Sequence, residues 1–483
     1  MLLVTLPILV MYTEAVLIPS LPAIQRQFHV SPSDVSWVLT IYLLTGTISV
    51  ALMGKLGDMY GKKKLFLIAL AVYTLGVTFA GFAPTFHALL LARALQGIGM
   101  AIFPLGFTIV REEFPPRMVP QVQGMISAMF GVGIVVALPL GSYIAENYGW
   151  ELTYHTVAPF AILMLVLSAR VLRESRYINP GKLDVPGAVL LSLFAASGLV
   201  AVTRAPDTGL TAPSTLAMFA LSLASLTLLI VRELKTDNPL IPVSLLTSRN
   251  VLITNLWIFL AGFAVQMMNQ AITYLFQMQP PYGYSKTILE SGLLMTPSAI
   301  AMLFIAPLVG RAMTRIGVKP FIQLGALLAI IGLVALSYDP VSIGLWKIVS
   351  LVVLVSTGIS VLNVSLINIL VFSVGRRVMG IATGLNSLFR NLGAAWGPAV
   401  AGTLMSMYSH VFYSYSAPGQ PGIHTCTESR SLPLPVPARN STLCCLARGD
   451  PSSKGSSPDG LAHASFLRLD LYPHKSLGCV APR

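Results

Sequence analysis

The chain has 483 residues, of which 55% are hydrophobic and only 10% are charged, and its mean hydropathy is +0.76. Soluble globular proteins carry roughly 25% charged residues, so this composition excludes a soluble domain and indicates a membrane protein. The formal net charge of +13 would suit a nucleic-acid partner, but the basic residues lie between apolar runs, so no nucleic-acid partner is expected.

Apolar runs long enough to cross a bilayer, which takes about 20 helical residues, recur along the chain as far as residue 408. Lipid cannot satisfy free backbone N–H and C=O groups, and the runs are not the short alternating segments of a membrane barrel. The predicted fold class is therefore an all-α, polytopic membrane protein. The thirteen predicted spans are 3–24, 37–53, 65–82, 88–110, 122–145, 156–172, 185–202, 214–231, 251–276, 292–310, 321–338, 348–372 and 381–408.

The first run could be mistaken for a signal peptide. It has no basic region before it, it is too long for a signal-peptide core, and Glu14 interrupts it, so we expect a retained helix. A charged group at this depth costs about 2.5 to 3.5 kcal/mol. An unpaired carboxyl could bind and release a proton near neutral pH. The alternatives are a structural acid paired with Arg93 and an acid that faces a wet cavity without titrating.

Basic residues are distributed unequally between the loops. The ends of the even-numbered spans carry 18 Lys and Arg residues, and the ends of the odd-numbered spans carry four. This bias predicts a multi-pass protein of the cell membrane with a cytoplasmic N-terminus.

The loop "GKLGDMYGKKKLF" places one acid and four lysines between the second and third spans. The lysines would hold the loop in the cytoplasm, while Gly54 and Gly61 permit a tight turn and close helix approach. Asp58 could act as a latch, because it can accept hydrogen bonds from helix ends or pair with a cation. The alternative is a solvated loop without a role. A phosphate-binding loop is excluded, because the spacing is one residue short and no Ser or Thr follows Lys62 and Lys63.

Two arginines lie inside predicted spans, Arg93 in the fourth and Arg390 in the thirteenth. A buried arginine keeps its charge, so Arg93 is expected to tune the proton affinity of a nearby acid or to hold an anion. For Arg390, which follows Asn386 by one helical turn, structural pairing and function remain equal alternatives.

Small residues recur every fourth position in the fifth span, at Gly133, Ala137 and Gly141, with Pro139 between them. Such a stripe lets helices pack closely. Whether it also seals the membrane against proton leak is left open by the sequence.

Uncharged polar side chains mark the second part of the chain. Gln266, Asn269 and Gln270 share one face of the ninth span, and Asn363 lies in the twelfth. Polar groups on an apolar surface suit a cavity for amphipathic or cationic organic compounds, and they equally suit interhelical hydrogen bonds. The candidate substrate cavity comprises Gln266, Asn269, Gln270, Asn363, Asn386 and Arg390.

One pattern of small residues occurs twice, in the fifth and thirteenth spans, at a constant shift of 260 residues. It divides the chain into a six-span bundle (1–180), two inserted spans (181–235) and a second bundle of five spans (236–415). Secondary transporters use repeated halves to build a central site that opens alternately to each side. The repeat matches Gly124, Ser127, Gly133, Ala137 and Gly141 with Gly384, Ser387, Gly393, Gly397 and Ala401.

The composition changes after residue 415. All four cysteines, nine of the 33 prolines and none of the 19 methionines fall in the last 68 residues, 416–483. We expect a disordered tail and interpret it as a non-native reading frame that replaces a lost last span. The cysteine spacing is not that of a zinc site, and we expect neither metal nor cofactor.

These motifs resemble those of the major facilitator superfamily, and within it the fourteen-helix drug:proton antiporters. Residues 54–63 are similar to the family motif G-x-L-a-D-x-x-G-R/K-K, and Arg93 and Gln96 are similar to R-x-x-Q-G-x-G. The stretch "GIVVALPLGS" resembles the antiporter motif, with Ala137-Leu138 in place of its Gly-Pro pair. The resemblance covers about residues 1–415 and implies two pseudo-symmetric six-helix bundles plus two intervening helices, with the fourteenth helix absent.

The resemblance implies a secondary active transporter, with proton-coupled antiport of small amphipathic or cationic compounds by alternating access. Glu14 and Arg93 would couple protons, and the loop around Asp58 would gate. Uptake or exchange of a metabolite is the alternative. A membrane-embedded enzyme is disfavoured, because the helix interiors offer one acid and the histidines are scattered. The expected partners are a small-molecule substrate, protons and the lipid bilayer. The chain is expected to be a monomer.

Overall fold

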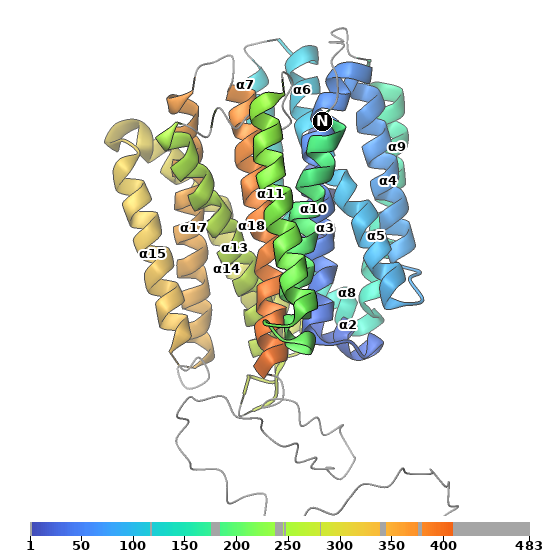
Figure 1. The fold of residues 1–483 in the computed structure, drawn as a ribbon, viewed down its shortest axis with the longest axis vertical. Helices are drawn as coiled ribbons and strands as arrows, with labels where there is room; N and C mark the ends of the chain where they lie inside the picture. Colours follow the sequence, from blue (N-terminus) through green and yellow to red (C-terminus); the bar gives the residue numbers. More distant parts are fainter. Residues whose placement is uncertain are drawn as a thin grey trace, which may run out of the picture. The chain divides into compact units, whose positions relative to one another are not determined.

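The computed structural model describes residues 2–408 apart from 116–117, 175–183, 237–244, 246–247, 281, 339–343 and 375–378. Every regular element in these residues is a helix, which confirms the all-α fold class (Figure 1). The predicted tail, 416–483, lies outside the described residues. The elements are α1 (Leu2–Ala15), α2 (Leu21–Phe28), α3 (Pro32–Tyr60), α4 (Lys62–Ala80), α5 (Phe86–Ile98), η1 (Gly99–Ala101), α6 (Ile102–Glu113), α7 (Val119–Val136), η2 (Ala137–Gly141), α8 (Ser142–Tyr148), α9 (Trp150–Val171), α10 (Val185–Thr208), α11 (Pro213–Lys235), α13 (Arg249–Gln277), α14 (Ile288–Ile316), α15 (Lys319–Ser337), α17 (Leu345–Ser373) and α18 (Met379–Tyr408).

Eleven candidate membrane spans are long and apolar enough to cross a bilayer, and each matches one predicted span. The thirteenth prediction falls on α18, and the first, as an unbroken helix, is wrong. α1 ends at Ala15, and α2 begins only at Leu21. Proline has no N–H, so Pro19 and Pro22 cannot donate the hydrogen bonds that a continuous helix would send to Ala15 and Ile18. The first predicted span is therefore interrupted between Ala15 and Leu21, directly after Glu14.

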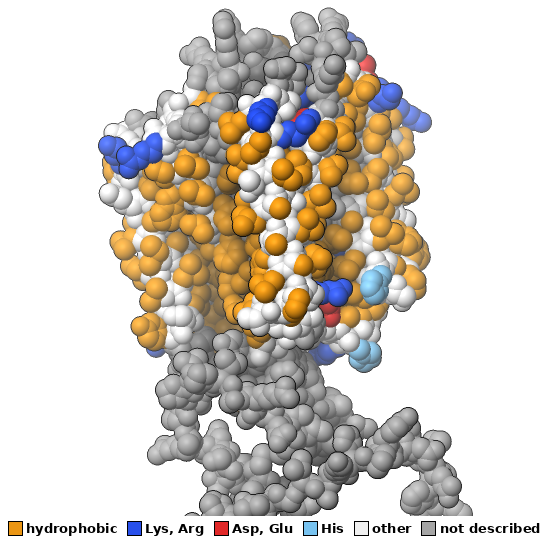
Figure 2. Space-filling model, viewed as in Figure 1, with side chains coloured by type: hydrophobic (Ala, Val, Ile, Leu, Met, Phe, Trp, Pro, Cys, Tyr) orange, Lys and Arg blue, Asp and Glu red, His pale blue; other side chains and the backbone are white. Residues whose placement is uncertain are grey.

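Hydrophobic side chains cover the middle of the flank drawn in Figure 2, and the Lys and Arg side chains on it lie near its two ends. On α11, the leucines Leu216, Leu223, Leu228 and Leu234 are all more than half exposed. An exposed apolar belt with charges at its rims is the surface that a lipid bilayer requires.

The fifth and thirteenth spans pack in the same way on different partners. α7 with η2 packs on α1, where a Cβ at Gly133 would lie 2.8 Å from the Met11 Cβ. α18 packs on α13, where a Cβ at Gly393 would lie 2.0 Å from the Phe259 carbonyl oxygen and one at Gly397 would lie 2.5 Å from that of Phe263. Gly133, Gly393 and Gly397 are thus positions of close helix approach in the two parts of the chain.

The two intervening helices, α10 and α11, pack against each other, and α10 also contacts α3 and α18. The Ser33 hydroxyl on α3 donates to the Thr203 carbonyl at 2.7 Å, and the Thr403 hydroxyl on α18 donates to the Val202 carbonyl at 3.0 Å. At the other end of the hairpin, Arg232 pairs with Asp184 at 2.8 Å. α10 therefore touches helices of both predicted bundles, 1–180 and 236–415, which we call the first and the second repeat.

The helix bundle has two ends, which we name by one residue each. The Arg26 face is formed by α2, the start of α3 and the connection between α13 and α14; the Lys62 face is the opposite end, at the junction of α3 and α4. By the distribution of basic residues, the Lys62 face is expected to be cytoplasmic.

Candidate transport site and gating surfaces

Glu14 lies one residue before the end of α1, at the break between α1 and α2. Its side chain is half-buried, whereas the preceding Thr13 is fully buried and its hydroxyl lies 2.7 Å from the Tyr73 hydroxyl. The carboxyl group is within electrostatic range of both Arg93 and Arg390. In the part of the chain that the structure describes, no ion pair or side-chain hydrogen bond occupies it. The charges of two arginines therefore act on the acid, and among the described residues neither of them forms an ion pair with it.

Arg93, on α5, is fully buried and held by neutral groups. Its Nε donates to the Val38 carbonyl at 2.9 Å. One terminal nitrogen donates to the Gln96 side chain at 2.8 Å and to the Thr13 carbonyl at 3.3 Å. The guanidinium carbon lies 4.3 Å from the centre of the Tyr42 ring, a cation–π contact. Arg93 thus ties α1, α3 and α5 together and holds its positive charge at the backbone of Thr13, the residue before Glu14.

Arg390, on α18, differs from Arg93 in its exposure. Its side chain is exposed although the residue lies in the middle of a 30-residue helix, and its charge interacts with that of Glu14. Asn386, one turn earlier, is buried and donates to the Asn255 side chain at 3.3 Å, so it joins α18 to α13. The predicted neighbours Arg390 and Asn386 therefore have different surroundings.

The remaining cavity candidates lie on α13 and α17. Asn269 donates to the Gln266 side chain at 3.0 Å along one face of α13. Gln270 is fully buried, and among the described residues neither atom of its amide group has a hydrogen-bond partner. The side-chain amide oxygen of Asn363 is likewise buried without a described hydrogen-bond partner. Unpartnered amides are unusual in a protein interior and mark places where a polar group of a solute or water can bind.

The predicted gating loop is a sharp junction between α3 and α4. Gly61 has φ +104°, a backbone angle that favours glycine, and it ends α3 and starts α4. The buried Lys62 side chain forms an ion pair with Glu112 at the end of α6, and the Lys63 N–H donates to Glu174 at 3.1 Å. Neither acid was singled out by the sequence analysis.

Two of the predicted gating residues are only partly covered. Gly54 and Asp58 belong to the helical backbone of α3, but their side chains lie outside the described residues. The latch assigned to Asp58 therefore stays a prediction.

The small-residue stripe includes a wide turn. Residues Ala137–Gly141 form one turn of π-helix around Pro139, which lacks the N–H that a regular helix needs. Ala137 and Gly141 are buried, and a Cβ at Gly141 would lie 1.9 Å from the Val16 side chain. A Cβ at Gly292 on α14 would come within 2.6 Å of the Leu138 carbonyl. The π-helical turn thus contacts both the break after α1 and α14, a helix of the second repeat. The close approach at Gly292 was not predicted from the sequence.

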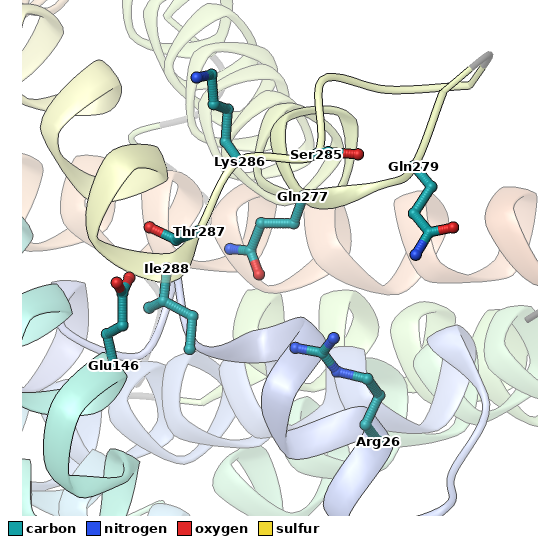
Figure 3. Close-up of a pocket in the computed structure, with 8 residues that line it drawn as sticks. All are labelled: Arg26, Glu146, Gln277, Gln279, Ser285, Lys286, Thr287 and Ile288. Carbon is teal, nitrogen blue, oxygen red and sulfur yellow. The ribbon is translucent and has the colours of Figure 1, made fainter. Parts of the chain in front are cut away.

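The Arg26 face holds the two repeats together. The Tyr274 hydroxyl donates to the Gln25 side chain at 2.5 Å, and the Gln277 amide donates to the Pro19 carbonyl at 2.6 Å. A pocket of about 360 Å³ lies at this junction (Figure 3). It is lined by Arg26, Glu146, Gln277, Gln279, Ser285, Lys286, Thr287 and Ile288.

α18 contacts α3 of the other repeat near the Arg26 face. Near the Arg26 face, a Cβ at Gly402 would lie 2.6 Å from the Pro32 carbonyl of α3, and the Ser33 N–H donates to the Ser406 hydroxyl at 2.9 Å. Toward the Lys62 face, Gly384 is exposed and no described atom lies within 4 Å of its Cβ position. The described hydrogen bond and the close approach of α18 to α3 therefore join the repeats near the Arg26 face.

A family model described as "Major Facilitator Superfamily" matches residues 3–398. The chain belongs to this superfamily. It is therefore a multi-pass secondary transporter rather than an enzyme, and the resemblance in its motifs is confirmed.

Relatives of this major facilitator protein carry export names. It is 27% identical over 381 residues to the "Multidrug transporter protein MdtP" of Bacillus subtilis (strain 168), covering 78% of this chain and 69% of that protein. It is also 27% identical over 387 residues to the "Tetracenomycin C resistance and export protein" of Streptomyces glaucescens, covering 80% and 71%. The human organic anion transporter MFSD10 shares its fold, with a TM-score of 0.57 at 17% identity over 84% of this chain and 93% of that one.

Proposed function

We propose that this chain is a proton-coupled exporter of small amphipathic compounds that works by alternating access. The supporting observation is the position of Glu14, half-buried at the break in the first span and within electrostatic range of Arg93 and Arg390. Low polarity opposes the charge of this carboxyl while two guanidinium groups favour it, so both protonation states are accessible. Its relatives' names, which refer to multidrug transport and to tetracenomycin C export, favour efflux.

In this proposal, the bundles 1–180 and 236–415 rock against each other around Glu14, and the helices of 181–235 accompany them. The Lys62 face is cytoplasmic, and the loop with Gly54, Asp58 and Gly61 latches it when it closes. A substrate enters from the cytoplasm while Glu14 is ionised, and a proton from outside then displaces it. The hydrogen bonds that join the repeats at the Arg26 face fit a state that is closed on that side.

The test uses purified full-length chain in vesicles that contain a pH-sensitive dye. A panel of amphipathic dyes is added under an imposed pH gradient, and both dye flux and proton flux are recorded. We expect substrate-dependent proton movement opposite to the dye. Glu14→Gln should abolish the proton movement, and Glu113→Gln, which changes an exposed acid at the end of α6, should leave it intact.

The direction of the two fluxes separates antiport from its alternative. Proton and solute moving in the same direction would indicate proton-coupled uptake. Solute flux that ignores the pH gradient in both wild type and Glu14→Gln would remove Glu14 as the coupling group.

A further inference from the structure

The Arg390 side chain is an exposed cation in the middle of α18, the helix on which the thirteenth predicted span falls. Among the described residues no group forms a hydrogen bond or ion pair with its guanidinium, whereas Arg93 has three hydrogen bonds and an aromatic ring. The neighbouring amide of Asn386 is already bound to Asn255. Arg390 therefore differs from an arginine that serves only to join helices.

A guanidinium group offers five N–H donors in a planar fork that matches a carboxylate or phosphate, and it stays charged at every physiological pH. Leaving these donors unpaired at membrane depth is costly unless water or a solute reaches them. The Arg390 side chain is exposed, so the described protein leaves space beside the group. An acidic group on the transported compound is the partner that such a fork binds best.

Glu14 lies on α1 and Arg390 on α18, so the electrostatic interaction between their charges acts across the two repeats. A purely cationic compound beside Glu14 would be repelled by Arg390, and a purely anionic compound on Arg390 would be repelled by ionised Glu14. A compound that carries both charges satisfies both side chains. Its basic group can compete with the proton at Glu14 while its acidic group stays on Arg390.

We propose that Arg390 binds the acidic group of a zwitterionic amphipathic substrate whose basic group lies at Glu14. This inference rests on the proposed transport function and narrows its substrate class. In this proposal Arg390 determines the preference for zwitterionic over cationic substrates, and Glu14 remains the group that couples transport to protons.

A matched pair of dyes tests the assignment. Rhodamine B carries a free carboxylate and is zwitterionic, whereas its methyl ester has the same ring system and is a cation. Binding of each dye to the full-length chain in lipid nanodiscs is measured by fluorescence anisotropy, without any pH gradient. We expect wild type to bind the zwitterion about tenfold more tightly, as for one charge-assisted hydrogen-bonded contact. Equal binding, or tighter binding of the ester, would overturn the proposal.

Variants locate the preference. Arg390→Gln should lose it, mainly through weaker binding of rhodamine B, and Arg390→Lys should keep part of it because the charge remains without the fork. Arg204→Gln, which removes an exposed arginine near the end of α10, should keep the wild-type preference. A preference that survives Arg390→Gln would also overturn the proposal. If that variant does not fold, the wild-type ratio and the lysine variant still decide.

The result is separable from the proposed function. A dye preference that depends on Arg390 without any pH-driven flux contradicts proton-coupled export and leaves the Arg390 site in place. Flux that is driven by the pH gradient and depends on Glu14, without tighter binding of rhodamine B than of its ester, supports export and contradicts the zwitterion assignment.

Discussion

The Glu146 carboxylate on α8 accepts a hydrogen bond from the Leu289 backbone N–H at the first turn of α14, with the two atoms 2.6 Å apart. The bond joins the first repeat to the second at the Arg26 face. A negative charge at a helix N-terminus also interacts favourably with the helix dipole. Glu146 thus forms at the Arg26 face the kind of bond to a helix end that was predicted for Asp58 at the Lys62 face.

We predict that Glu146→Ala loosens the Arg26 face. Losing a charge-assisted hydrogen bond costs roughly 1.5 to 3 kcal/mol, so the open state of this face should become about tenfold more populated or more. The measurement is the rate at which a maleimide labels Ser285→Cys in the pocket, in a chain whose four cysteines are replaced by serine.

The control for this prediction is Glu151→Ala. Glu151 also accepts a side-chain hydrogen bond, from Gln27 at 2.7 Å, but both residues belong to the first repeat. The labelling rate of Ser285→Cys should stay at the wild-type value in this variant. If Glu146→Ala and Glu151→Ala label at the same rate, Glu146 does not hold the face closed.

The ion pair between Lys62 and Glu112 supplies a second prediction. Both side chains are more than four-fifths buried, so removing one partner leaves an uncompensated charge. Lys62→Met alone should lower the free energy of unfolding by roughly 3 kcal/mol, and the double variant with Glu112→Leu should recover most of this loss. Unfolding in a mixed detergent titration measures both values. Additive losses in the double variant would show that the pair is not coupled.

Much of the fold could be predicted because hydropathy and length act locally. Apolar runs of spanning length become helices wherever they lie. The interruptions inside these runs were missed, such as the break after α1 and the π-helical turn Ala137–Gly141, since the prolines there do not interrupt the apolar run. The small-residue stripe predicted close packing but not its partner, because nothing local to Gly133 points to Met11.

The gating surfaces were harder to predict because their partners lie far away in the sequence. Lys62 pairs with an acid 50 residues later, and Glu146 bonds to a backbone N–H 143 residues later. Each of these acids reads as an ordinary end-of-helix residue in the sequence. Arg390 and Glu14 were both singled out as intramembrane charges, but the electrostatic interaction between them follows from how the repeats pack.

The close approach of Gly141 to Val16 gives the last prediction. A Cβ at Gly141 would lie 1.9 Å from the Val16 side chain, two residues beyond Glu14, so Gly141→Ala must displace the break after α1. Overpacking of this kind costs about 1 to 3 kcal/mol. We expect a lower unfolding temperature and reduced pH-driven flux.

Gly310→Ala is the matched control for Gly141→Ala. Gly310 also lies inside a membrane-spanning helix, but no described atom lies within 4 Å of its Cβ position. Alanine is the better helix former by roughly 1 kcal/mol, so this variant should be as stable as wild type or slightly more stable. Differential scanning fluorimetry separates the two cases. Equal melting temperatures for the two variants would show that the contact at Val16 relaxes without cost, and the small-residue stripe would then not fix the position of Glu14.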